Sequence, residues 1–223
     1  MKRVSVVGTR HEEAGLASIS GLLGILERIT PEVIFLEIPS AAIDDYSKGS
    51  RRNLESTAVS RYREMHHVDL VPVDRPTPDA ELFSNNEDLY RSIESKSPEY
   101  CRLMDRHIQD VRTYGFAYLN SEHCSTFWSK LHEAILTAIE ELADRRLAEL
   151  YELWIGTNKL RDKHMMESIE NYCRKTTFSN GVFLVGSAHR QAIIDISREQ
   201  PGADSPTIQW DVAGFLEAKA PTT

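Results

Sequence analysis

The chain has 223 residues, with 41% hydrophobic and 27% charged, and its 34 acidic residues against 26 basic ones give a formal net charge of −8. A chain of this length fits one domain or two small ones and can bury a full core without disulfides. The acidic balance argues against a nucleic-acid partner, because nucleic-acid binders normally carry a basic face. The three cysteines are widely spaced and odd in number, so they indicate neither a disulfide framework nor a cysteine-rich zinc site.

The sequence predicts neither export nor insertion in a membrane. The apolar run behind the first three residues is only four residues long, at 4–7, whereas the apolar core of a signal peptide has ~7–15. No apolar stretch approaches the ~20 residues of a membrane-spanning helix. We therefore expect a cytoplasmic protein with no membrane span.

The first third of the chain alternates strand and helix patterns. Short apolar runs at 4–7, 33–36 and 68–73 predict three buried strands. Between the first two runs, apolar residues recur every three or four positions from Leu16 to Ile29, which predicts a helix. A charged stretch from Arg51 to His66 predicts a second helix. This alternation is typical of a parallel sheet with crossover helices.

The middle of the chain carries helical patterns only. Apolar positions from Leu131 to Leu150 predict one amphipathic helix, and a further helix is expected from about Trp154 to Arg174. We assign the large side chains of this region to a helical core rather than to a cofactor site. They are Phe127, Trp128, Trp154, Met165 and Met166.

The strand pattern returns near the end of the chain. A run at 182–185 predicts a fourth strand, a helix follows through Ile193 and Ile196, residues 201–206 predict a loop, and a last strand is expected at 207–212. We therefore predict one α/β domain over 1–223 with a mostly parallel central sheet flanked by helices. A large all-helical insertion, 78–178, separates the third strand from the strand at 182–185.

A glycine and a histidine recur at one spacing behind two predicted strands. Residues 7–11 read Val-Gly-Thr-Arg-His, and residues 185–189 read Val-Gly-Ser-Ala-His. Gly8 and Gly186 permit a sharp turn and a close backbone approach where each strand ends. Sites in open parallel sheets form at the carboxyl ends of the strands. We therefore expect His11 and His189 at one edge of the sheet, each before a helix, although a strand-end histidine can also cap a helix.

Two carboxylates end the other predicted strands. Glu37 closes a strand that is otherwise wholly apolar, so it needs a partner such as an arginine, because burying an unpaired carboxylate is costly. Asp74 precedes Arg75 and fits a turn equally well. Imidazole and carboxylate side chains bind divalent transition metals. They also serve a metal-free hydrolase, with histidine as the general base, and the residues alone leave both alternatives open.

The order of these motifs resembles the Tiki/TraB superfamily of hydrolases, which includes PrgY and, more distantly, ChaN-like and erythromycin-esterase-like proteins. The resemblance covers about residues 4–200. It rests on the paired GxxH motifs, on Glu37 after the second strand, on Asp74-Arg75 after the third, and on Arg161-Asp162 before Met165. The chain departs from the family after both histidines. Glu12-Glu13 stands where Val-Ser is usual, and we assign it to the acidic first turn of a helix.

The resemblance implies hydrolysis of a peptide, amide or ester bond by activated water, with a peptide or small molecule as substrate. In the metal-dependent form, which is the one we expect, His11, Glu37 and His189 hold Mn, Co or Zn beside a bound water. In the metal-free form, a histidine takes the proton from water while Glu37 fixes its tautomer. In both forms Arg161 stabilises an oxyanion or holds a substrate carboxylate.

A second class of function fits the same resemblance. PrgY-like and ChaN-like relatives make a non-catalytic, regulatory protein that binds a peptide or haem a credible alternative. The helical insertion could serve as a lid or as the interface of an oligomer, and its periodicity does not distinguish the two.

Overall fold

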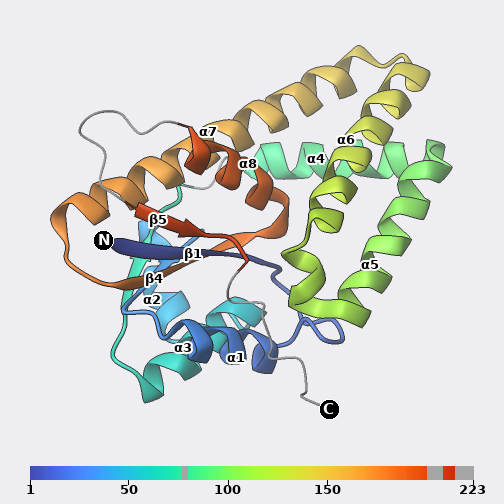
Figure 1. Cartoon of the computed structure of the whole chain (residues 1–223). Helices are drawn as coiled ribbons and strands as arrows, with labels where there is room; N and C mark the ends of the chain where they lie inside the picture. Colours follow the sequence, from blue (N-terminus) through green and yellow to red (C-terminus); the bar gives the residue numbers. More distant parts are fainter. Residues whose placement is uncertain (77–79, 200–207, 214–223) are drawn as a thin grey trace.

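The computed structural model describes residues 1–76, 80–199 and 208–213 (Figure 1). Five strands in this part of the chain form one sheet in the order β3-β2-β4-β1-β5, and every neighbouring pair is parallel. The strands are β1 (Lys2–Thr9), β2 (Val33–Leu36), β3 (Asp69–Pro72), β4 (Asn180–Gly186) and β5 (Ile208–Asp211). The predicted α/β class with a parallel sheet is confirmed. The predicted loop at 201–206 lies outside the described residues.

Helices surround this sheet, and the described ones include none long and apolar enough to cross a membrane. Before β3 they are α1 (Ile19–Ile29), the 3-10 turn η1 (Ser40–Ala42), α2 (Ile43–Ser47) and α3 (Leu54–Met65). After β3 they are α4 (Ala80–Lys96), α5 (Pro98–Leu119), α6 (Glu122–Leu142), α7 (Arg145–Lys175) and α8 (Ser187–Arg198). The segment between β3 and β4 is thus helical as predicted, although Pro78 itself lies outside the described residues.

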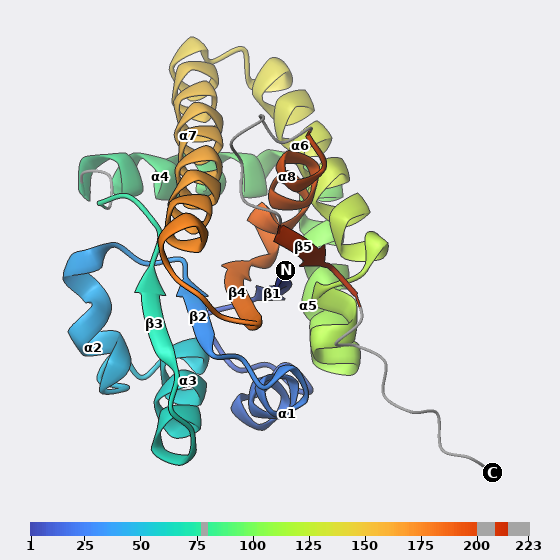
Figure 2. The ribbon, with the colours of Figure 1, turned by 60° about the vertical axis from the view of Figure 1, so that its left-hand side comes forward.

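The sheet is buried on both faces because successive side chains of each strand point to opposite sides. Ile34 and Leu36 of β2 belong to a core with α1, α2 and α3. Their neighbours Val33 and Phe35 belong to a second core with α7 and α8. Figure 2 shows the two groups of helices on opposite sides of the strands. Continuous apolar runs, rather than alternating ones, are what such a doubly covered sheet requires.

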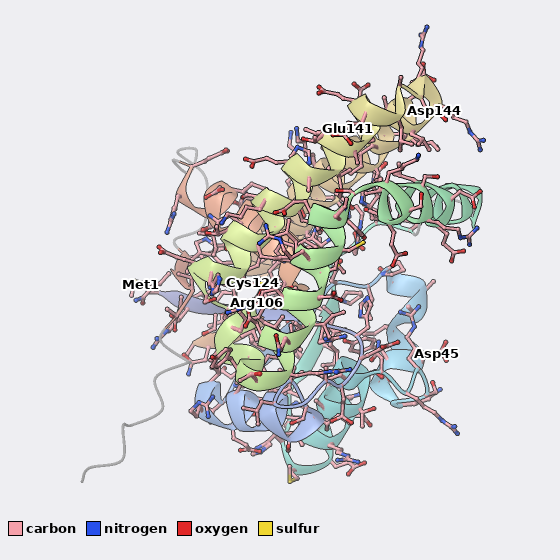
Figure 3. All side chains as sticks on the ribbon, turned by 90° about the vertical axis from the view of Figure 1, so that its right-hand side faces the viewer. Met1, Asp45, Arg106, Cys124, Glu141 and Asp144 are labelled. Atoms are coloured by element: carbon pink, nitrogen blue, oxygen red, sulfur yellow. The ribbon has the colours of Figure 1, made fainter. Side chains whose placement is uncertain are left out.

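Helices α4, α5 and α6 of the insertion, together with the first part of α7, form a third layer at the carboxyl ends of the strands (Figure 1). In Figure 3, Cys124 marks the end of α6 beside the sheet, and Glu141 and Asp144 mark the far tip of the layer. The single helix predicted from Leu131 to Leu150 is wrong. Ala143 adopts a left-handed φ of 51°, and the Asp144 side chain then caps α7 by accepting hydrogen bonds from its first amides.

The helix predicted from Leu16 begins later than expected. Ser18 caps α1 by accepting a hydrogen bond from the Gly21 amide, and Leu16 is 63% exposed in the preceding loop. The assignment of Glu12 and Glu13 to the first turn of this helix is therefore wrong. Glu13 reaches the helix from outside it, because its Oε1 accepts a hydrogen bond of 2.7 Å from the Ile19 amide.

Gly8 ties β1 to the helical layer. Its amide donates to Oδ1 of Asn120 at 2.6 Å, and its carbonyl accepts from Nδ2 of Asn120 at 3.0 Å. A Cβ atom at Gly8 would lie 2.9 Å from the Leu119 carbonyl oxygen and 2.8 Å from Cδ of Arg190. The glycine of the first motif is therefore needed where the end of α5 packs against the strand.

We predict that Asn120→Ala lowers the free energy of unfolding by about 1–3 kcal/mol, because it leaves the buried Gly8 amide and carbonyl without partners. Urea denaturation of the wild type and the variant measures this change. Asn171→Ala, which removes an exposed amide bonded to Arg174, is the matched control and should change stability by less than about 0.5 kcal/mol. Equal effects of the two substitutions would contradict this role of Asn120.

Candidate functional site

Four of the residues expected at the site meet at the carboxyl ends of the strands. Glu37 directly follows β2, Asp74 lies two residues after β3, and His189 lies in the first turn of α8, behind β4. Arg161 reaches them from α7. All four side chains line one cavity of about 770 Å³, which we call the polar cavity.

Arg161 lies between the two carboxylates. Its Nη2 donates to Oε1 of Glu37 at 2.6 Å and to Oδ2 of Asp74 at 2.8 Å, and its Nε donates to the same Asp74 oxygen at 3.1 Å. The Arg161 side chain is 19% exposed. Burial lowers the pKa of Arg161, but the hydrogen bonds and charges of Asp74 and Glu37 outweigh burial, so the net shift is upward. One permanent positive charge is thus shared between two carboxylates at the strand ends.

Glu37 is also bonded to the second GxxH motif. Its Oε2 accepts a hydrogen bond of 2.6 Å from the Gly186 amide. A Cβ atom at Gly186 would lie 3.3 Å from this oxygen, which is a tight contact. The expectation that Glu37 needs a partner such as an arginine is confirmed, because Arg161 pairs with it. The backbone amide of Gly186 is a second partner.

His189 and Asp162 form a buried dyad. Nδ1 of His189 lies 2.6 Å from Oδ1 of Asp162, and the two side chains are 12% and 7% exposed. On the other side of the ring, Nε2 lies 3.4 Å from Oε1 of Glu37 and 3.3 Å from Nη1 of Arg161. Asp162 therefore holds the Nδ1–H tautomer, which leaves Nε2 facing the polar cavity. The metal-free form assigned that task to Glu37, but here Asp162 occupies the position.

The environment of His189 favours its protonated form. Burial lowers the pKa of His189. The hydrogen bond to Asp162 and the negative charges of Glu37 and Asp162 raise it by more, so the pKa lies above the usual 6.5. In the sequence, Asp162 stands out only as the neighbour of Arg161 in a shared motif, and the motif alone predicts no role for it. Its position beside Arg161 was the one available signal.

His11 lies apart from these four residues. The two GxxH motifs were expected to precede helices in the same way, and this is wrong: α8 begins at Ser187, whereas α1 begins eight residues after His11. The His11 side chain is 75% exposed, lines the same polar cavity, and has its Nδ1 3.0 Å from Oε2 of Glu55. No bond joins it to Glu37 or His189 within the described residues.

Glu55 is a buried carboxylate that the sequence did not reveal. It lies in the first turn of α3, inside a stretch rich in charged residues, yet it is 5% exposed. Its other oxygen accepts a hydrogen bond from the Thr9 hydroxyl at the end of β1. The hydrogen bond that His11 donates to Glu55 raises the pKa of His11 above 6.5, against the opposing effect of burial.

The metal set expected from the sequence, His11, Glu37 and His189, is not gathered around one point. Both oxygens of Glu37 accept hydrogen bonds from Arg161 and Gly186, and His11 pairs with Glu55 instead. Within the described part of the chain no three His, Cys, Asp or Glu side chains are placed to hold a metal ion. A divalent ion at Glu37 would have to displace Arg161. The metal therefore stays a prediction, and the arrangement found here does not fit it.

A comparison with known proteins finds no matching family model, no matching curated protein and no matching solved structure.

We predict that His189 titrates above pH 6.5 and that Asp162→Asn lowers this midpoint, because the substitution removes the charge that stabilises the imidazolium. Since the folded pKa is raised, the stability that His189 contributes is full below the pKa of the unfolded chain. It is lost as the pH rises through the folded pKa. NMR titration of the histidine ring protons measures the midpoint.

The His66 signal provides an internal control, because His66 pairs with Glu27 on the outer surface and should be unaffected by Asp162→Asn. A His189 midpoint below 6.5, or one that Asp162→Asn leaves in place, would show that the dyad does not govern this ring.

Proposed function

We propose that the protein is a cytoplasmic hydrolase of the Tiki/TraB type, in which His189 activates water to cleave a peptide, amide or ester bond. One observation carries this proposal. Asp162 fixes the His189 ring through Nδ1, and Nε2 faces the polar cavity, where it contacts Arg161 and Glu37. A base oriented by a carboxylate and exposed to a cavity is the arrangement that general-base catalysis requires.

The reaction begins with proton transfer to His189. Nε2 takes a proton from a water molecule in the polar cavity as the water oxygen attacks the substrate carbonyl carbon. The resulting imidazolium donates through Nδ1 to Asp162 and faces Glu37 through Nε2. Both carboxylates therefore stabilise the charge that forms there. When the carbonyl reforms, Nε2–H gives its proton to the leaving nitrogen or oxygen, which yields an acid and an amine or alcohol.

Arg161 supplies the positive charge of the site. Its Nη1 lies 3.3 Å from the reacting nitrogen of His189, close to where the oxyanion of the tetrahedral intermediate develops. Three of its contacts, to Glu37, Asp74 and Asn158, hold the guanidinium in place. A cation fixed in this way needs no reorganisation when negative charge appears on the substrate.

The arrangement favours the metal-free form of the reaction over the metal-dependent one. A metal in a Tiki-type site lowers the pKa of a bound water. Here Arg161 already bonds to the Glu37 oxygen that faces His189, so the positive charge that a metal would bring is supplied by the chain itself. The family assignment remains part of the proposal, and it rests on the order of the motifs.

We predict that a panel of fluorogenic esters, amides and short peptides contains a compound that the protein hydrolyses. For that compound, His189→Ala lowers kcat/KM by about 10²–10⁴-fold, the usual contribution of a general base. The rate should rise with pH through the raised pKa of His189, because the base must be neutral. His66→Ala is the matched control and should retain full activity.

Undiminished turnover in His189→Ala would overturn this assignment of the base. If no compound in the panel is turned over while the cavity still binds ligands, the non-catalytic binding protein is the correct class. A Soret band on adding haem would then identify the haem-binding form of that alternative.

A further inference from the structure

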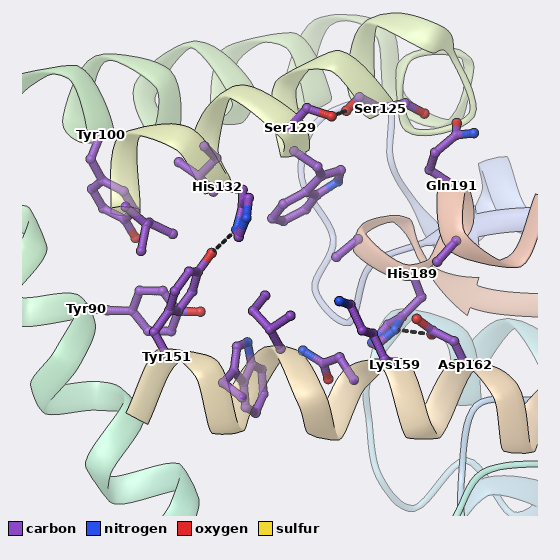
Figure 4. A pocket seen from close by; sticks show the side chains of 18 of the residues that line it. Tyr90, Tyr100, Ser125, Ser129, His132, Tyr151, Lys159, Asp162, His189 and Gln191 are labelled. Carbon is purple, nitrogen blue, oxygen red and sulfur yellow. Dashed lines mark hydrogen bonds and ion pairs between the residues drawn. The ribbon is translucent and has the colours of Figure 1, made fainter. Parts of the chain in front are cut away.

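A second cavity adjoins the polar cavity at His189. It has a volume of about 790 Å³ and lies among α4, α5, α6, α7 and α8 (Figure 4). We call it the aromatic cavity, after the rings in its wall, which belong to Tyr90, Tyr100, Trp128, His132, Tyr151 and Trp154. Six residues line both cavities: Met104, Trp128, Trp154, Asn158, Ala188 and His189. A single ligand can therefore extend from one cavity into the other past the proposed base.

Aromatic rings form the wall of the aromatic cavity opposite the dyad. The Tyr151 hydroxyl is bonded to Nδ1 of His132 at 2.6 Å, as Figure 4 shows. Burial raises the pKa of Tyr90 to about 12 and that of Tyr151 further still, so both hydroxyls keep their protons at neutral pH. Aromatic faces without charge favour an apolar, ring-bearing ligand. Trp128 and Trp154 pack against the core of the insertion, as predicted, and both also line this cavity.

The polar cavity contains a cation without a partner. Arg10, the third residue of the first GxxH motif, lines this cavity. Its Nε is buried and makes no hydrogen bond, and no ion pair to Arg10 occurs in the described ranges 1–76, 80–199 and 208–213. The nearby His107 adds no second positive charge at neutral pH, because burial and the charge of Arg10 lower the pKa of His107 to about 4. Unlike Arg161, which is paired with Glu37 and Asp74, Arg10 has no carboxylate partner among the described residues and is available to a carboxylate of the ligand.

We propose that the natural ligand is a small carboxylate that also carries an aromatic ring. The ring lies in the aromatic cavity, the carboxylate pairs with Arg10, and the bond to be cleaved lies between them at His189. Only one part of this assignment rests on the proposed function, namely that a bond of the ligand is cleaved at His189. The selectivity for a ring and a carboxylate is a property of binding, so it can be measured without turnover.

Three probes separate the two features of this ligand. They are 4-phenylbutyrate, its neutral amide 4-phenylbutyramide, and butyrate, which lacks the ring. Calorimetric titration of the full chain should show 4-phenylbutyrate binding about tenfold tighter than the amide, the effect of one charge-assisted hydrogen bond. It should also bind at least about tenfold tighter than butyrate, because butyrate buries no ring.

Two substitutions should remove these preferences separately. Arg10→Gln should abolish the preference for 4-phenylbutyrate over its amide, while Arg61→Gln, on the outer surface of α3, leaves it unchanged. Ala192 lines the aromatic cavity, so the larger side chain of Ala192→Phe fills the space that the ligand ring would occupy. This variant should therefore lose the preference for 4-phenylbutyrate over butyrate. Circular dichroism confirms that each variant is folded before it is titrated.

The outcomes distinguish this inference from the proposed function. Equal binding of all three probes to the wild type would overturn it, and so would an Arg10→Gln variant that still prefers the carboxylate. Hydrolysis that depends on His189, without probe selectivity, would leave the hydrolase standing and remove the ligand assignment. Selective binding without any hydrolysis of ring-bearing esters or amides would support the ligand assignment and remove the hydrolase.

Discussion

The contact of Arg161 with Glu37 and Asp74 determines how the rest of the site is arranged. These carboxylates end two neighbouring strands, and parallel strands bring their carboxyl ends to one edge of the sheet. Without a cation between them, two partly buried negative charges would face each other, at a cost of several kcal/mol. Arg161 removes this repulsion and, because it belongs to α7, it also fixes the helical insertion to the sheet.

One turn of α7 supplies three parts of the site. Arg161 points to the strand ends, and its neighbour Asp162 contacts α8, because adjacent residues of a helix face different directions. Asn158, one turn earlier, accepts a hydrogen bond from Arg161 at 3.3 Å. The position of His189 relative to Glu37 therefore depends on how α7 packs across the sheet. A small shift of this helix would change the orientation of the proposed base and the place of the cation together.

Much of this site follows from the sequence, and the rest depends on packing between distant elements. Apolar runs located the strands, so the strand-end residues Glu37, Asp74 and His189 could be placed at one edge. His11 could not, because the spacing of a motif does not reveal that a loop of nine residues, 10–18, separates β1 from α1.

The partners supplied by helices are harder to predict. Glu55 is buried by tertiary contacts although its stretch is rich in charged residues, and Asp162 gains its role only when α7 meets α8. The same limit explains Trp128 and Trp154. Helical spacing identifies a residue that faces other helices, but it cannot distinguish a filled core from the wall of a cavity.

The central claim is that a guanidinium, rather than a metal ion, supplies the positive charge at the strand ends. The most direct test is a titration of the melting temperature with Mn, Co and Zn, in the tag-free wild type, Glu37→Gln and His189→Ala. A ligand at ~100 times its Kd adds ~2.7 kcal/mol of stability, which is readily measured. The account predicts no stabilisation of the wild type by any of these ions. Stabilisation of the wild type that both variants lose would contradict it and would place a metal at Glu37 and His189.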